Sequence, residues 1–89
     1  MIEFDLIITN VKGLHARASA KFVEKVESFN SRCEISKDGM SVSGDSIMGL
    51  LMLAASKGSR INVKVWGKDA DLLSSAIKAL VENNFDEDS

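Results

Sequence analysis

The first segment of the chain alternates between hydrophobic and polar positions. A period of two places every second side chain on the same face of an extended strand. The side chains on the apolar face are Ile2, Phe4, Leu6 and Ile8. The pattern therefore predicts a half-buried strand over residues 2–9, followed by a connecting loop at residues 10–13.

Two later segments, residues 32–36 and 60–66, alternate in the same way. The Asp-Gly pair at 38–39 follows the first of them and precedes a short return strand that begins at Met40. An Asp-Gly pair between apolar stretches is a strong local signal for a β-hairpin. Cys33, the one cysteine, is interpreted as a small core residue.

Residues 16–29 and the segment after Asp69 show the period of about 3.6 residues that is typical of an amphipathic helix. Asp69 is expected to cap the second of these helices. Its apolar stripe should consist of Leu72, Leu73, Ala76, Ile77, Leu80 and Val81. Polar residues and acids follow, and we expect the end of the chain, residues 86–89 in particular, to fray.

Another helix is predicted from Ile47 to about Ala55, with Ser46 or Asp45 as its N-cap and Gly58 as its stop. This helix is apolar on nearly every side, which a domain of this size cannot bury. We therefore expect part of it to face water and to meet another protein, unless the helix lies deep against the sheet. The candidates for the exposed part are Ile47, Met48, Leu51 and Met52.

The order of these elements is strand, helix, strand, strand, helix, strand, helix. Strands with one apolar face need cover on that face only, and three helices can supply it. We therefore predict an α+β fold, a two-layer open-faced sandwich in which a four-stranded antiparallel sheet is covered on one face by three helices. The 89 residues fit a single domain.

Composition narrows the classes of function. The formal net charge is −2, and three acids crowd the end of the chain, so the folded body is close to neutral and nucleic acid is not an expected partner. One cysteine and one histidine form neither an internal disulfide nor a zinc cluster. No apolar run reaches membrane-spanning length, and we expect a monomeric cytoplasmic protein without membrane insertion.

The candidate chemistry lies in the pentapeptide Gly13-Leu14-His15-Ala16-Arg17, which contains the only histidine. It stands where the first predicted strand ends and a helix begins, so the imidazole should point at the unpaired backbone N–H groups of the helix's first turn. Such a terminus favours anions, and a neutral imidazole nitrogen is a nucleophile. With the Arg17 guanidinium two residues on, the arrangement indicates a histidine that accepts a phosphoryl group.

Arg17, Lys21 and Lys25 recur every four residues along the same predicted helix. Two interpretations of this basic stripe are open, a solvated helix face or a docking strip for an acidic partner. We favour the docking strip because it begins at the candidate site.

Three motifs, at residues 13–17, 46–49 (Ser-Ile-Met-Gly) and 57–58 (Lys-Gly), together resemble the HPr family. HPr is the histidine-containing phosphocarrier of the bacterial phosphoenolpyruvate-dependent phosphotransferase system. The resemblance extends over essentially the whole chain. It implies the strand order 1-4-2-3 and a phosphoryl carrier that is not itself an enzyme and needs no cofactor.

The resemblance also implies partners and site residues. Enzyme I would pass a phosphoryl group to Nδ1 of His15, and an EIIA domain would receive it on the way to a sugar. Arg17 would contact the phosphate, and Ser46 would be a regulatory site for an HPr kinase/phosphorylase. The residues expected to contact partners are Ala16, Lys21, Lys25, Ile47, Met48 and Leu51.

One position differs from the family's pattern, since Ala18 stands where proline is usual. We expect the site to survive, because alanine is an excellent helix former. Two other functions stay open: a nitrogen-type carrier that serves only regulatory EIIA proteins, and a small binding module without phosphotransfer. A plain N-cap is the alternative for Ser46. A self-sufficient hydrolase is not expected, because the sequence offers no second general base or metal cluster.

Overall fold

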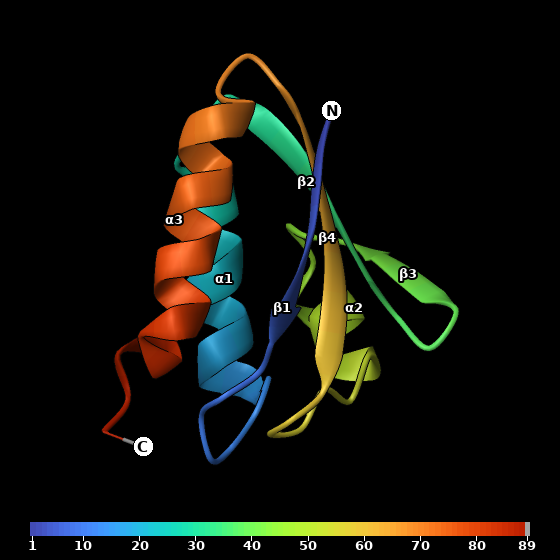
Figure 1. Cartoon of the computed structure of the whole chain (residues 1–89), viewed down its shortest axis with the longest axis vertical. Helices are drawn as coiled ribbons and strands as arrows, with labels where there is room; N and C mark the ends of the chain where they lie inside the picture. Colours follow the sequence, from blue (N-terminus) through green and yellow to red (C-terminus); the bar gives the residue numbers. More distant parts are fainter. Residues whose placement is uncertain (89) are drawn as a thin grey trace.

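The computed structural model describes residues 1–88, and its elements follow the predicted order (Figure 1). The strands are β1 (Ile2–Ile7), β2 (Ser31–Lys37), β3 (Met40–Ser43) and β4 (Arg60–Gly67). The helices are α1 (Ala16–Glu27), α2 (Ile47–Met52), α3 (Ala70–Glu82) and the 3-10 helix η1 (Asn84–Asp86). The predicted α+β fold is confirmed, and η1 is an addition that the sequence pattern did not indicate.

The sheet is antiparallel throughout and has the strand order β1-β4-β2-β3, as the resemblance implied. Phe4 of β1 pairs with Val63 of β4, and Cys33 of β2 pairs with Val65 of β4. Because side chains alternate along each strand, this register collects the apolar residues of the three strands on one face. The helices α1 and α3 run side by side along that face (Figure 1).

The core lies between this face and the helices. Its buried members include Phe22 of α1, Leu50 of α2 and Ile77 of α3, all of which are fully buried. Cys33 belongs to the same cluster, as predicted. Burial, with the negative charges of Asp45 and Glu34 nearby, raises the pKa of Cys33 to about 12. The thiol therefore stays protonated and unreactive at neutral pH.

The hairpin between β2 and β3 forms at the predicted Asp-Gly pair. Asp38 has φ 49° and Gly39 has φ 84°, which is the left-handed pair that a tight hairpin turn requires. Lys37 of β2 pairs with Met40 of β3 across this turn. The local sequence signal was therefore sufficient to place the hairpin.

The helix α2 is shorter than predicted. It ends at Met52 and not near Ala55, because Ala54 adopts a left-handed backbone with φ 52° directly after the C-cap residue Leu53. The predicted stop, Gly58, lies in the turn before β4, where its N–H donates to the carbonyl of Ile8 at 2.7 Å. A left-handed alanine is uncommon, so sequence reasoning chose the next glycine instead.

One expectation for α3 is wrong, and another is confirmed only in its position. The buried stripe is narrower than predicted and passes through Leu73, Ile77, Leu80 and Val81. Leu72 lies beside that stripe and is 61% exposed. Asp69 is the N-cap residue, but its carboxylate accepts a hydrogen bond from the Asn30 backbone N–H at 2.8 Å and makes no capping bond.

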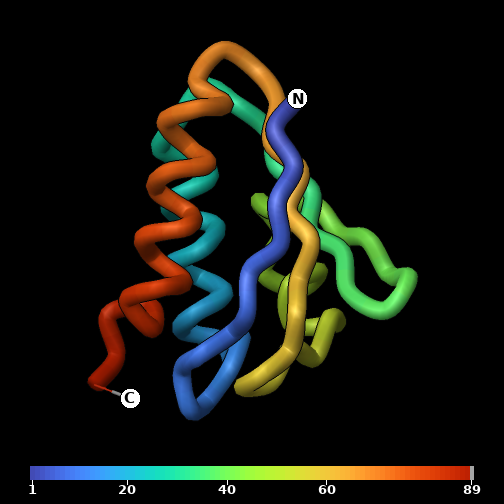
Figure 2. The backbone as a smooth tube through the Cα atoms, viewed as in Figure 1, coloured from blue at the N-terminus to red at the C-terminus, as the bar shows by residue number. Residues whose placement is uncertain are grey.

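The C-terminal segment packs against the body, contrary to the expectation of fraying. Phe85 is fully buried in the core, and Lys21 Nζ donates to its carbonyl oxygen at 2.7 Å. Figure 2 shows this segment returning to the end of the molecule that also holds the loop after β1. Ser89, the last residue expected to fray, lies outside the described residues.

Candidate functional site

The loop between β1 and α1 fixes the position of His15. Asn10 is fully buried, and its Nδ2 donates to the Gly13 carbonyl at 2.8 Å. Gly13 has φ 66°, and a Cβ at this position would lie 2.5 Å from the carbonyl oxygen of Ala55. Leu14 is buried, and its N–H donates to that same oxygen at 2.8 Å. The turn therefore requires glycine at position 13. The bond from Asn10 before Gly13 and the bond from Leu14 after it hold the turn against buried parts of the protein.

His15 is the N-cap residue of α1, which confirms its predicted place in the fold. Its backbone is extended, with φ −75° and ψ −179°, and its carbonyl accepts the first intrahelical bond from the Ser19 N–H at 2.8 Å. The N–H groups of residues 16–18 have no carbonyl four residues earlier inside the helix, so the terminus keeps its partial positive charge. The His15 side chain is 26% exposed and can be reached from solvent.

The imidazole does not bond the first-turn N–H groups, which corrects one expectation. Its Nε2 forms a hydrogen bond with Oε2 of Glu87, a residue 72 positions further along the chain. The other carboxylate oxygen of Glu87, Oε1, accepts from Asn10 Nδ2 at 2.9 Å. These bonds from Asn10 and His15, with weaker attraction from Lys12, hold the pKa of Glu87 below its usual range. Glu87 is therefore an ionised acceptor at neutral pH.

A surface hollow of about 720 Å³ opens at the His15 ring. Lys12, Arg17 and Lys21 bring positive charge to its wall, and Asp86, Glu87 and Asp88 bring negative charge. Arg17 is exposed, so its guanidinium is accessible to an anion that enters the hollow. Lys21 is partly engaged by the Phe85 carbonyl. The hollow thus combines a ring nitrogen, a helix N-terminus and an exposed cation.

The other residues of the predicted basic stripe are divided between two places. Ala16 and Lys21 line the hollow at His15. Lys25 lines a separate hollow of about 300 Å³, together with Ala76 of α3 and Asn83, the residue directly after that helix. The structure therefore places His15, Ala16, Arg17 and Lys21 together and sets Lys25 apart.

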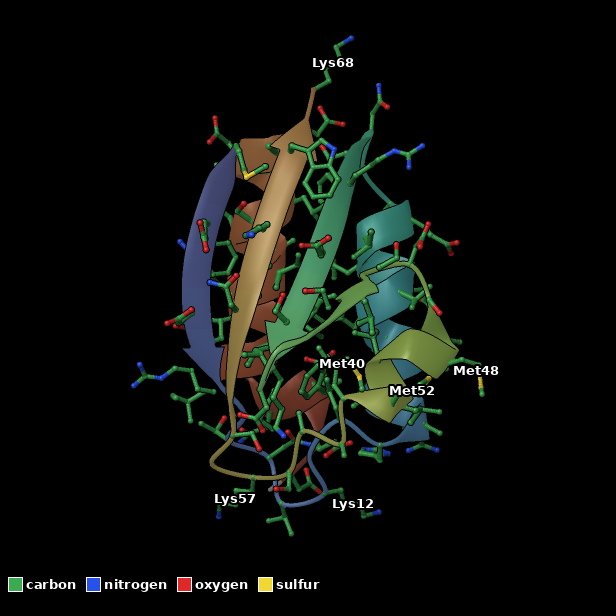
Figure 3. The ribbon with its side chains drawn as sticks, turned by 90° about the vertical axis from the view of Figure 1, so that its right-hand side faces the viewer. Lys12, Met40, Met48, Met52, Lys57 and Lys68 are labelled. Atoms are coloured by element: carbon green, nitrogen blue, oxygen red, sulfur yellow. The ribbon has the colours of Figure 1, made fainter. Side chains whose placement is uncertain are left out.

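Ser46 and the apolar residues after it form a second feature of the surface. Ser46 is the N-cap residue of α2, as predicted, and its Oγ accepts from the Gly49 N–H at 3.0 Å. Met48 and Met52 are 69% and 64% exposed and point outward from α2 (Figure 3). Ile47 is also exposed, and Leu51 is half-buried. We call Ile47, Met48, Leu51 and Met52 the α2 patch, and its predicted exposure is confirmed.

The described residues contain no group of three His, Cys, Asp or Glu side chains that could hold a metal ion. Within residues 1–88, no helix combines the length and the apolar character needed to cross a membrane.

Sequence reasoning missed Glu87 and Asn10 as neighbours of the ring. Glu87 was interpreted as part of a frayed acidic end, and Asn10 as an ordinary loop residue. The available signal was Phe85, a large apolar residue between asparagines and acids. A residue of that kind usually has a core to pack against, and its burial is what brings Glu87 to His15.

Comparison with known proteins agrees with this geometry. The family model described as PTS HPr component phosphorylation site matches residues 2–83. Phosphocarrier protein HPr from Xylella fastidiosa (strain 9a5c) is 45% identical over 89 residues, which is 100% of both chains. Phosphocarrier protein HPr from Cupriavidus necator is 41% identical over 87 residues, or 98% of each chain.

Solved structures of HPr proteins have the same fold as this chain. HPr-C-His from Thermoanaerobacter tengcongensis has a TM-score of 0.95 at 35% identity, with 100% of both chains covered. Phosphocarrier protein HPr from Bacillus anthracis has a TM-score of 0.86 at 35% identity, with 90% of this chain and 95% of that chain covered. By family model, full-length relatives and fold, the chain belongs to the HPr family of the phosphotransferase system.

Proposed function

We propose that the chain is a phosphoryl carrier that accepts a phosphoryl group from phosphorylated Enzyme I on His15 and passes it to an EIIA domain. The observation that supports this most directly is the partly exposed ring at the N-terminus of α1, in the same hollow as the Arg17 guanidinium. The carrier acts as a cytoplasmic monomer and catalyses no reaction of its own.

The transfer needs only one bond to form and one to break. Nδ1 of His15 attacks the phosphorus atom while the bond from phosphorus to the donor histidine breaks. The His15 ring, neutral with its proton on Nε2, becomes positively charged when Nδ1 bonds to phosphorus, and the protonated ring of the donor phosphohistidine becomes neutral when it leaves; the phosphoryl group carries its own negative charge across. No proton has to move, so the step depends mainly on positioning and on charge compensation.

The forces that hold the phosphoryl group are modest. A helix terminus contributes about 0.3–1 kcal/mol, and a hydrogen bond to a charged group such as Arg17 contributes roughly 1.5–3 kcal/mol. These values suit a carrier, because the group must leave as readily as it arrives. Deeper stabilisation would trap it on His15.

Partners dock on the face that carries both the hollow and the α2 patch. The patch adjoins α1, since α1 and α2 pack against each other. Exposed methionines suit a surface that meets several proteins, because the side chain is flexible and polarisable. The proposed contacts around the ring are Ala16 and Lys21. Lys25, one turn further along α1 and beside α3, is a proposed contact at the margin of this face.

Ser46 is the proposed regulatory site, and an HPr kinase/phosphorylase is its proposed modifying enzyme. A phosphate there would add about two negative charges at the N-terminus of α2 and directly beside the patch. The fold would be preserved, because the helix terminus tolerates an anion. Docking of Enzyme I on an apolar surface would become weaker.

The test is incubation of the full chain with Enzyme I and phosphoenolpyruvate, followed by measurement of the intact mass before and after mild acid. We expect one acid-labile phosphoryl group on the parent protein and none on His15→Ala. Addition of an EIIA domain should then remove the group. An unmodified parent protein, or normal shuttling by His15→Ala, would refute the proposal.

A further inference from the structure

We infer that Glu87 is a positioning residue for His15, because its carboxylate keeps the ring proton on Nε2 and so leaves Nδ1 as the nucleophilic nitrogen. The inference rests on the proposed function and deepens it. It concerns a residue beyond the part of the chain that the family model matches, which ends at residue 83.

The first step is the assignment of donor and acceptor in the contact between the two side chains. An ionised carboxylate can only accept hydrogen bonds, so the proton between Glu87 and His15 belongs to Nε2. A neutral imidazole carries a single ring proton. When that proton is on Nε2, the lone pair is on Nδ1.

The second step is the orientation of Glu87 by Asn10. The buried Asn10 side chain donates through Nδ2 both to the Gly13 carbonyl and to Oε1 of Glu87. Its Oδ1 is buried and has no hydrogen-bond partner among the described residues. The amide is therefore held by its two donor bonds, and they connect the turn that carries His15 to the carboxylate that orients its ring.

The third step is the anchoring of the segment that presents Glu87. Phe85 is fully buried, and the consecutive residues Asn84, Phe85 and Asp86 have φ values of 55°, 55° and 63°. Three adjacent left-handed residues with side chains are costly and persist only where contacts impose them. Those contacts are the bond from Lys21 to the Phe85 carbonyl, at 2.7 Å, and the bond from Thr9 Oγ1 to Asn84 Oδ1, at 2.6 Å.

The chemistry of the contact also explains why a carboxylate is required. Glu87 meets a donor on each side, Asn10 Nδ2 at Oε1 and His15 Nε2 at Oε2. A glutamine side chain has one oxygen and one NH₂ group. Its oxygen can accept from one of these two donors, and its NH₂ group would then face the other donor. Glu87→Gln should therefore hold the ring less well than the parent, and Glu87→Ala should not hold it at all.

The test uses the full, unphosphorylated chain labelled with ¹⁵N, and reads the ring nitrogens of His15 and the proton bound to them by NMR. In the parent protein we expect the proton on Nε2, with a signal that is visible because a hydrogen bond slows its exchange. Glu87→Ala should lose this signal and should raise the share of the Nδ1–H tautomer several-fold. Glu82→Gln, which removes the same charge from an exposed residue of α3 outside the hollow, should leave the spectrum like that of the parent.

The kinetic arm measures phosphorylation by Enzyme I and phosphoenolpyruvate. Loss of a group that orients a functional histidine reduces activity by roughly tenfold or more in other sites, and we expect about tenfold slower acceptance for Glu87→Ala. A parent ring that carries its proton on Nδ1, a Glu87→Ala spectrum identical to that of the parent, or faster phosphorylation of Glu87→Ala would each overturn the inference. The NMR arm needs no Enzyme I, so it decides the role of Glu87 even if the proposed transfer fails.

Discussion

At the scale of single residues, the site depends on one ring nitrogen and a few charges. His15 lies at a helix N-terminus that attracts anions, and Arg17 adds an exposed cation on the wall of the same hollow. Glu87 supplies the opposite charge at Nε2. The ring therefore lies between a carboxylate, which we propose holds its proton, and cations that we propose contact the phosphate.

Arg17→Ala should slow phosphoryl transfer both to and from His15. The variant loses one charge-assisted hydrogen bond, which contributes roughly 1.5–3 kcal/mol. Loss of that contribution in the transition state corresponds to a rate that is about 10- to 100-fold lower. Rapid-quench measurement with Enzyme I in one direction and an EIIA domain in the other would provide both rates. Lys68→Ala is the matched control, since Lys68 is an exposed cation at the opposite end of the molecule from Lys12 (Figure 3). Equal rates for Arg17→Ala and this control would show that Arg17 does not contact the phosphate.

The position of His15 could be predicted from the sequence, but its contact with Glu87 could not. The pentapeptide was sufficient to predict His15 at the start of a helix, because the change from a period of two to a period of 3.6 occurs there. The contact between His15 and Glu87 joins residues 72 positions apart. No local pattern reports such a contact, since it depends on how the end of α3 packs.

At the scale of elements, α2 combines a capping serine with an exposed apolar surface. Ser46 Oγ satisfies the Gly49 N–H, and the next two residues, Ile47 and Met48, are exposed. The same residue therefore stabilises the helix and stands beside the proposed docking face. On the proposed function, a charge at Ser46 would therefore affect docking without any change of fold.

Substitutions of Ser46 should separate its two roles. Ser46→Ala removes the cap and should lower the free energy of unfolding by about 0.5–2 kcal/mol, with little effect on phosphorylation by Enzyme I. Ser46→Asp keeps a good cap and adds charge, so it should unfold like the parent but accept phosphate more slowly. Urea denaturation and initial phosphorylation rates measure the two effects. If Ser46→Asp is phosphorylated as fast as the parent protein, the regulatory role is refuted.

A charge placed in the α2 patch should weaken the contact with Enzyme I. Met48 is 69% exposed, so Met48→Asp should fold normally. The substitution removes a proposed contact with Enzyme I, and a loss of about 1 kcal/mol in binding free energy would raise KM roughly fivefold. Leu72→Asp is the control, because Leu72 is 61% exposed on the first turn of α3, away from the patch. A KM for Met48→Asp that matches that of Leu72→Asp would exclude the patch from the interface.

The boundaries of the elements were the least predictable part of the fold. Ala54 ends α2 with a left-handed backbone that its sequence does not signal, and Leu72 lies just outside a stripe that its hydrophobicity suggested it would join. In both cases tertiary packing decided the outcome. The Asp38-Gly39 hairpin was predictable because the turn itself demands those residues.

At the scale of the whole molecule, the C-terminal segment completes the site. The alternating strands and amphipathic helices were sufficient to predict a sheet with helices on one face. They did not indicate that the chain continues past α3 to place Phe85 in the core and Glu87 at the first loop. Both ends of the sequence therefore contribute to one surface hollow.

Phe85→Ala should destabilise the protein and release the segment that holds Glu87. Removal of a buried phenylalanine ring typically costs 3–5 kcal/mol, and we expect about 3 kcal/mol here because the end of the chain can relax. Urea denaturation measures this loss, and Leu72→Ala, which truncates an exposed side chain, should change stability by less than about 0.5 kcal/mol. Equal stabilities for Phe85→Ala and Leu72→Ala would show that residues 84–88 do not pack as described.

The central claim is that Nδ1 of His15 carries the phosphoryl group. The most direct measurement is NMR of the ¹⁵N-labelled chain after reaction with Enzyme I and phosphoenolpyruvate, with detection of coupling between phosphorus and each ring nitrogen. The account predicts a single phosphoryl group coupled to Nδ1, which disappears when an EIIA domain is added. A phosphoryl group on Nε2 or on a serine, or a chain that remains unmodified, would contradict it.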